Sequence, residues 1–465
     1  MLERIQTFGE SLTEWMEEKG LSAASLSVYT RATRDATIAR LMHDQLDYQR
    51  CARYITELAE SYPGIDEETL KRLRCAVDVN RYGKEMYAAQ LDFAGMLSGE
   101  RPISESDGKL IDLMSRLEDW AKGMSFKILC MGVTDDEPLR FLCMVSQAFK
   151  DVHIYQFFNQ RRVSQLSRLL ARTLPMAFNP NYELYSLKDD AGILLNSVMI
   201  FRRDDGAQLI YVYDGNEFSI MNLTPGNDLF EFCFSIYLKR QHDARKINCH
   251  FTYNCPKAYI DFLSHCLQLE TDRAIYQIKS EIGLEYVPVD ILYENFAEWT
   301  KKNDPRFLPF LDELRDIFAL RGENIRTKKE PTTLIMTQNG MKEFAKTGRM
   351  KDHPFCMRPF TPNERRRILS ALLESAETSN VYPLIFSDEN MELDHSFIGY
   401  SRECMLVCKA QADYDLANYT EIVLTSEALS GQFADYVVNF LVRNNVLSRR
   451  AGLEFIYSLY QCIEE

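Results

Sequence analysis

The feature that most constrains the fold of this chain is a nearly continuous apolar run, FKILCMGV, at residues 126–133. A run of this length is typical of a strand that is buried on both faces of a parallel sheet. A helical pattern, LRFLCMVSQAFKD, follows it, and a second strand pattern, VHIYQFF, comes next. This β-α-β order predicts a right-handed crossover between parallel strands. The chain therefore contains an α/β region.

Strand patterns of a second kind occur further along this region. GILLNSVMIFRR and AQLIYVYDG alternate in polarity and are joined by Asp204-Asp205-Gly206, which predicts a hairpin. Antiparallel hairpins beside parallel strands predict a mixed sheet. The hairpin pattern of residues 382–409 is loosely similar to that of 193–221. An internal duplication is one explanation, although residue identity does not demonstrate it.

The end of the chain carries its own helix and strand signals. Thr361, Pro362 and Glu364 form the start signal of a helix, with a capping threonine, a proline at the first position and a glutamate at the third. Two amphipathic helical patterns close the chain. We therefore expect two α/β domains, at 110–330 and 331–465, the second ending in two helices.

The first 98 residues read as helices only. Gly20 is a stop signal for the first helix, and Ser22 is a cap for the next. The polar stretch LSGERPISESDGK, at 97–109, is the best linker candidate in the chain. The fold class that we predict is multidomain, with an all-α N-terminal domain at 1–98 and a larger α/β region with mixed sheets.

The composition of the chain argues against several classes of protein. No apolar run approaches the roughly 20 residues that a membrane-spanning helix needs, and the N-terminus lacks the apolar core of a signal peptide, so we expect a cytoplasmic protein without a membrane partner. The 12 cysteines are scattered, which favours reduced core residues. The net charge of −14 argues against a general nucleic-acid coat.

One short segment has a local positive charge and a specific layout. Residues 12–46 read as helix, short turn and helix. The matching residues are Glu18-Lys19-Gly20-Leu21-Ser22, Ser25-Leu26-Ser27 and Thr37-Ile38-Ala39-Arg40. This pattern resembles the lambda-repressor-like, or XRE, group of helix-turn-helix proteins, and the residues that follow it are similar to poorly characterised regulator-like proteins of Firmicutes.

The resemblance implies a DNA-binding domain whose recognition helix begins near Thr33. Arginine can bond guanine in bidentate fashion, and threonine can contact bases or phosphates. The side chains that we expect to contact double-stranded DNA, at bases or phosphates, are Arg31, Thr33, Arg34, Thr37, Arg40, Arg50 and Arg53.

These expectations combine into a bacterial transcriptional regulator. A homodimer would read two half-sites about one helical turn apart, and a small-molecule or peptide effector on the α/β region would shift the population of DNA-competent arrangements. Two alternatives stay open. One is an interaction protein that docks another protein through a degenerate helix-turn-helix, and the other is an enzyme in the α/β region whose residues we do not recognise.

Other residue clusters give weaker signals. His242, His250 and His265 lie near three cysteines, but their spacing matches no familiar zinc site. The acidic run SDENMELDH, at 387–395, could hold a cation, but a polar hairpin turn explains it more simply. No nucleophile elbow, Walker loop or dinucleotide fingerprint occurs. We therefore expect no enzymatic activity, with no catalytic residue, metal or cofactor.

Overall fold

The computed structural model describes most of the chain, and the fold below refers to these residues. They are 5–30, 34–98, 107–149, 151–159, 163–187, 197–223, 228–239, 244–252, 256–350, 358–409 and 420–463. The chain divides into two compact units, Met1–Asp92 and Phe93–Glu465, and each is described by itself.

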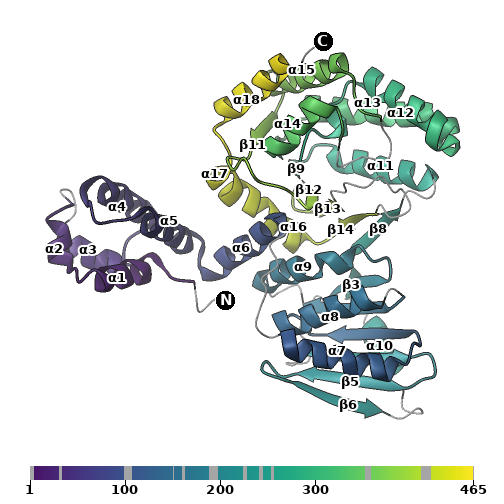
Figure 1. The fold of residues 1–465 in the computed structure, drawn as a ribbon, viewed down its shortest axis with the longest axis horizontal. Coiled ribbons are helices and arrows are strands. Elements are labelled where there is room, and N and C mark those ends of the chain that lie inside the picture. The colour runs from purple at the N-terminus through teal and green to yellow at the C-terminus, as the bar shows by residue number, and fades with distance from the viewer. Residues whose placement is uncertain are drawn as a thin grey trace. The chain divides into compact units, whose positions relative to one another are not determined.

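The described part of the first unit consists of helices (Figure 1). Gly20 follows the first helix with a φ of +63°, and the Ser22 hydroxyl accepts a hydrogen bond from the Ser25 amide, so both predicted end signals are confirmed. Phe8, Trp15 and Ile38 belong to its core. The predicted start of the third helix, near Thr33, lies outside the described residues. The helices are α1 (Phe8–Glu18), α2 (Ala23–Ser27), α3 (Asp35–Met42), α4 (Tyr48–Ser61), α5 (Glu67–Tyr82) and the first part of α6 (Lys84–Ser98).

The second unit begins with the predicted β-α-β arrangement. Strands β1 (Phe126–Met131), β2 (His153–Asn159) and β3 (Tyr182–Leu187) are parallel neighbours, which confirms the parallel pairing that the apolar run predicts. Helices α8 (Asp136–Ala148) and α9 (Val163–Ala177) join them.

An antiparallel meander extends the other side of β1. It consists of β4 (Ser197–Arg203), β5 (Gln208–Tyr213) and β6 (Phe218–Leu223), and β4 pairs with β1. Gly206 has a φ of +85° at the turn between β4 and β5, which confirms the predicted hairpin. We call the resulting sheet sheet 1; its strand order is β6-β5-β4-β1-β2-β3-β7, where β7 is Ala244–Lys246.

The second sheet repeats this topology with later strands. Strands β9 (Ile275–Lys279), β10 (Thr332–Met336) and β11 (Val381–Ile385) are parallel, and a meander lies beside β9. The meander consists of β12 (His395–Tyr400), β13 (Cys404–Lys409) and β14 (Thr420–Leu424), and the order of sheet 2 is β11-β10-β9-β12-β13-β14-β8. The similar hairpin patterns of residues 193–221 and 382–409 thus belong to two sheets with the same strand arrangement. Because β9 and β10 are paired, sheet 2 crosses the boundary that we placed at residue 330.

Helices connect and cover the strands of sheet 2. The two crossovers run between β9 and β10 and between β10 and β11, and the last helices follow β14. The Thr361 hydroxyl and the Glu364 carboxylate form the predicted capping box. The elements are α11 (Pro256–Glu270), η2 (Leu284–Tyr286), α12 (Val289–Asn303), η3 (Pro305–Phe310), α13 (Leu311–Thr327), α14 (Gln338–Thr347), α15 (Pro362–Thr378), α16 (Glu427–Tyr436), the π-helix η5 (Val437–Leu441), α17 (Val442–Asn444) and α18 (Arg449–Cys462).

A single extended segment joins the two sheets. Its first part, β7 (Ala244–Lys246), pairs with β3 of sheet 1, and its second part, β8 (Asn248–Thr252), pairs with β14 of sheet 2 (Figure 1). Asn248 is fully buried at this crossing. Its Oδ1 accepts from the Leu184 amide and its Nδ2 donates to the Tyr182 carbonyl, both at 2.8 Å. The asparagine side chain therefore adds two hydrogen bonds between this segment and the backbone of β3.

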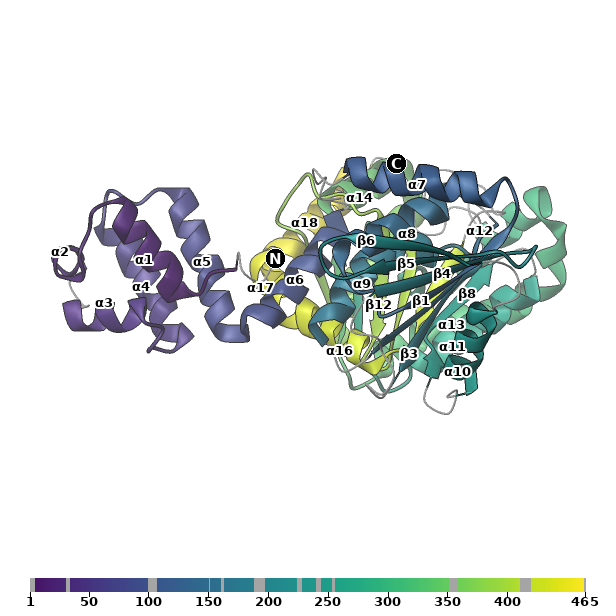
Figure 2. The ribbon, with the colours of Figure 1, turned by 90° about the horizontal axis from the view of Figure 1, so that it is seen from below.

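The two faces of sheet 1 are covered unequally. Helices α7 (Asp107–Ala121), α8 and α9 pack on one face, and α10 (Leu229–Lys239) lies on the other (Figure 2). In sheet 2, α11 to α15 pack on one face, and α16 and η5 on the other.

The observed architecture confirms part of the predicted fold class. Helices together with two mixed sheets make the chain a multidomain α/β protein. No helix among the described residues is long and apolar enough to cross a membrane.

We expect Asn248→Ala to destabilise the second unit, because it leaves the buried Leu184 amide and Tyr182 carbonyl without these partners. The expected loss in the free energy of unfolding is about 3 kcal/mol. Urea unfolding followed by circular dichroism measures it, with Asn216→Ala in the exposed β5–β6 turn as the matched control. Equal urea midpoints for the two variants would show that the sheets do not depend on this link.

Candidate protein-interaction surface

The residues predicted to contact DNA fall into three groups. Arg31 and Thr33 lie outside the described residues. Arg34 is the exposed N-cap of α3, which also carries the half-buried Thr37 and the exposed Arg40. Two further arginines are exposed on α4, and one of them is paired with Asp47 at 3.5 Å; these residues are Arg50 and Arg53. The structure therefore brings three of the seven side chains onto one helix, and their role in DNA contact stays a prediction.

The histidine- and cysteine-rich segment does not assemble a metal site among the described residues, where no group of three or more His, Cys, Asp or Glu could hold an ion. His250 lies on β8, with Nε2 at 2.5 Å from the Ala177 carbonyl, and burial lowers the pKa of this imidazole. His395, at the end of the acidic run, stacks on Phe178 with ring centroids 5.3 Å apart. Both histidines pack where the α9 end meets sheet 2.

A buried cluster of charged side chains lies between sheet 2 and its helices. Arg321 of α13 donates to both carboxylate oxygens of Glu270 on α11, at 2.5 to 3.0 Å. Nζ of Lys279 lies 3.9 Å from Oε1 of Glu285, and none of these four side chains is more than 7% exposed. The sequence signal for this cluster was the polar residues inside the strand pattern IYQIK, and our sequence reasoning missed it.

The charges of this cluster are paired within it. Gln277 donates to Glu285 at 2.5 Å and accepts from the Tyr286 hydroxyl at 3.2 Å. Although burial opposes ionisation, the charges of Lys279 and Arg321 lower the pKa of Glu285 to about 2. Enclosure keeps solutes away from these groups, so we assign the cluster a structural role in fixing the packing of α11 and α13 on the sheet.

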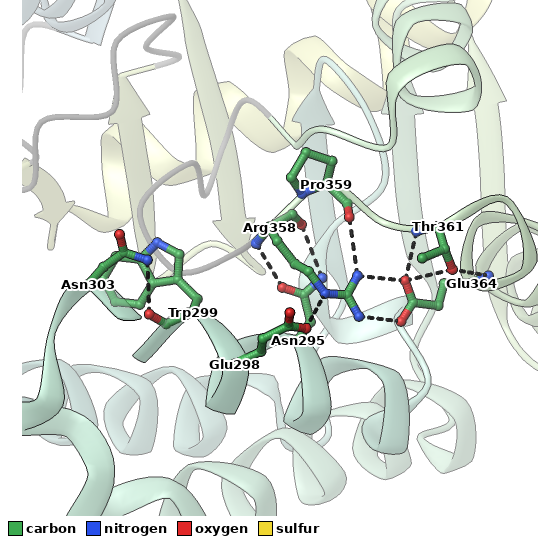
Figure 3. A network of polar contacts seen from close by, with 8 residues as sticks. All are labelled: Asn295, Glu298, Trp299, Asn303, Arg358, Pro359, Thr361 and Glu364. Atoms are coloured by element: carbon green, nitrogen blue, oxygen red, sulfur yellow. Dashed lines mark hydrogen bonds and ion pairs between the residues drawn. The ribbon is translucent and has the colours of Figure 1, made fainter. Parts of the chain in front are cut away.

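A second polar network, around Arg358, fastens α15 to α12 (Figure 3). The Arg358 amide donates to Oδ1 of Asn295 at 2.9 Å, and its guanidinium donates to both oxygens of Glu364 at 2.8 Å and to Glu298 at 2.6 Å. The hydrogen bonds that its guanidinium donates to Glu364 raise the pKa of Arg358. Glu364 also accepts from the Thr361 amide at 2.7 Å, so the same carboxylate caps the helix and holds the arginine.

A small surface cavity lies beside the start of β1. Its volume is about 170 Å³, below the roughly 300 Å³ at which ligand pockets of proteins begin. Asp151 is the one ionisable side chain among its lining residues, which are Gly123, Met124, Ser125, Phe126, Phe149, Asp151 and Val152. This cavity does not bring together an acid, a base and a nucleophile.

The face of sheet 1 opposite α7, α8 and α9 offers a different kind of site. We call it the α10 face; its buried residues are Leu129, Met131, Phe157, Leu187, Val198, Ile200 and Ile210, with Phe230 of α10 packed on them. Two apolar side chains of α10 point away from this core, since Phe232 is 62% exposed and Ile236 is 37% exposed. They are four residues apart and therefore lie on one side of the helix.

An exposed apolar side chain of the last strand of sheet 1 lies on the same face of the sheet as α10. Met221 of β6 is 58% exposed and pairs with Ile210, a residue of the α10 face. Acidic side chains flank the first turn of α10, where Arg202 bridges Asp228 at 3.2 Å and Glu231 at 4.0 Å. Phe232 and Ile236 therefore form an exposed apolar side of α10 with acidic residues at its start, which we call the α10 surface.

Comparison with known proteins gives no family for this chain. No family model matches it, and no curated protein matches it. Phosphatidylserine synthase from Haemophilus influenzae is 11% identical, with a TM-score of 0.25 over 77% of this chain and 88% of that one. Polyphosphate kinase from Porphyromonas gingivalis is 9% identical, with a TM-score of 0.21 over 73% and 51%. A yeast tyrosyl-DNA phosphodiesterase variant is 10% identical, with a TM-score of 0.19 over 65% and 84%.

This comparison contradicts our expectation of a DNA-binding transcriptional regulator without enzymatic activity. The three structures named above are a synthase, a kinase and a phosphodiesterase, and none of them is a helix-turn-helix regulator. We had based the regulator prediction on the resemblance of residues 12–46 to helix-turn-helix proteins, whereas the matches to these three structures cover the larger part of the chain. At these TM-scores the likeness supplies no substrate, reaction or residue role.

We expect Lys279→Met to destabilise the protein strongly, because it leaves Glu285 buried beside fewer positive charges. Breaking a buried ion pair in this way costs about 3–5 kcal/mol, and adding Glu285→Gln should recover part of it. Lys257→Met is the control, since it removes an exposed ion pair with Asp261 at 3.1 Å and should cost less than about 1 kcal/mol. Equal losses for the two lysine variants in urea unfolding would refute the structural role.

Proposed function

We propose that this chain is an interaction protein whose α/β unit docks a partner protein on the α10 surface. The observation that carries the proposal is the composition of α10, LFEFCFSIYLK, which is apolar on the side that faces away from the sheet as well as on the side that faces it. A helix that is hydrophobic all round is normally buried on all sides. Exposed apolar patches of this kind mark interaction sites.

The acidic residues at the start of α10 favour a partner with positive charge. Glu231 and Asp228 stand at the start of the helix with about half of each side chain exposed, and the whole chain has a net charge of −14. A partner segment with an apolar stripe bordered by lysine or arginine would satisfy both parts of the surface. We therefore propose a basic amphipathic helix as the occupant.

The helical first unit fits the same class of protein. We propose that it keeps a helix-turn-helix fold, which the succession of α1, α2 and α3 with its Gly20 and Ser22 end signals supports. Val28, just beyond the end of α2, is 77% exposed, and Tyr29 is 44% exposed. These apolar side chains lie next to the predicted recognition helix and are suited to protein contacts.

A labelled amphipathic peptide of leucine and lysine tests the proposal by fluorescence anisotropy. We expect the wild-type protein to bind it and the double variant Phe232→Ser, Ile236→Ser to bind it about tenfold more weakly, which corresponds to 1.4 kcal/mol. Glu231→Gln should weaken binding and reduce its salt dependence, because it removes a charge at the start of α10.

The matched control is Leu320→Ser on α13, a side chain that is 47% exposed on the other half of the unit. It should leave the affinity unchanged. The proposal fails if the wild-type protein does not bind the peptide, or if the double variant and the Leu320 variant bind it equally well.

A further inference from the structure

The two sheets share one topology but differ at the edge of the meander. In sheet 2, the last strand β14 pairs antiparallel with β8. In sheet 1, the equivalent strand β6 ends the sheet, and no described residue pairs with its outer side (Figure 1). Among the described residues, a strand position that is filled in the second half is thus open in the first half.

Of the other three outer strands, β7, β8 and β11, two have features that block pairing with further chains. Strand β7 is three residues long and contains Arg245 and Lys246, and β11 contains Pro383 and packs against α18. Short, charged or proline-containing edges are how proteins prevent strand addition. The sequence of β6, FSIMNL, has six residues with no charge, no proline and no glycine. Of the edges formed by β6, β7 and β11, β6 is the one suited to accept another strand.

We infer that β6 pairs antiparallel with β6 of a second copy of this chain, so that two copies of sheet 1 form one continuous sheet. A strand that pairs with itself about a two-fold axis gives an isologous interface. The uncharged composition of β6 favours this occupant, because a chain of net charge −14 can approach a copy of itself only where no carboxylates face each other. This assembly goes beyond the proposed docking of a basic helix and does not depend on it.

Strand geometry restricts the register of this pair. Residues directly opposite each other point to the same face of a sheet, so two identical strands related by a two-fold axis must be centred on a residue. Centring on Met221 places the exposed apolar side chains of the two strands against each other. It also brings Ser219 opposite Leu223 of the second copy, and it leaves the α10 surfaces of both copies on the same side of the joined sheet.

A charge-swap experiment tests this interface. Sedimentation velocity of the wild-type protein should give a dimer, with twice the 54.1 kDa mass of one chain. Met221→Lys and Met221→Glu should each give a monomer, because like charges then meet at the centre of the interface. An equimolar mixture of the two variants should restore the dimer. Circular dichroism verifies that both variants are folded.

The control is Ile111→Lys on α7, because Ile111 and Met221 are both 58% exposed. This variant should remain a dimer. Three results would overturn the inference: a wild-type protein that is monomeric throughout, a dimer that persists in both Met221 variants, or a mixture of the variants that stays monomeric. The first would mean that two copies do not associate, and either of the others would mean that β6 strands centred on Met221 do not hold the two copies together.

Discussion

The pairing of residues 244–252 with both sheets is the interaction on which the rest of the second unit depends. Along this segment the chain leaves the edge of sheet 1 and becomes the edge strand of sheet 2, and the buried Asn248 side chain bonds the backbone of β3 at the crossing. Main-chain hydrogen bonds are directional, so this segment holds the β3 edge of sheet 1 and the β14 edge of sheet 2 in a defined arrangement. Its second part pairs with β14, whereas among the described residues no strand pairs with the outer side of the equivalent strand β6.

The two halves differ mainly in how their surfaces are covered. Sheet 2 has helices on both faces and carries an enclosed set of paired charges, whereas the α10 face of sheet 1 has a single helix with apolar side chains directed outward. The buried charged cluster fixes how the helices pack on sheet 2. The exposed apolar side of α10 is instead a surface that a partner could cover. The first half thus carries the surfaces that we propose for association, and the second half encloses its charged cluster.

Local signals in the sequence predicted much of the secondary structure. The run at 126–133, the Asp-Gly turn at 204–206 and the cap at Thr361 all hold, since each depends on neighbouring residues. The pairing of β9 with β10 across residue 330, and the sharing of 244–252 between sheets, depend on contacts between residues distant in sequence, which periodicity does not encode. The apolar composition of α10, LFEFCFSIYL, is visible in the sequence, but which of its side chains stay exposed depends on how the helix packs on the sheet.

Hydrogen exchange at residues 218–223, followed by mass spectrometry at several protein concentrations, tests the central claim most directly. We propose that the β6 edge and the α10 surface are association surfaces. On this proposal the amides of 218–223 exchange more slowly as the protein concentration rises, while those of β11 at 381–385 do not change. Exchange at 218–223 that is independent of concentration would contradict it.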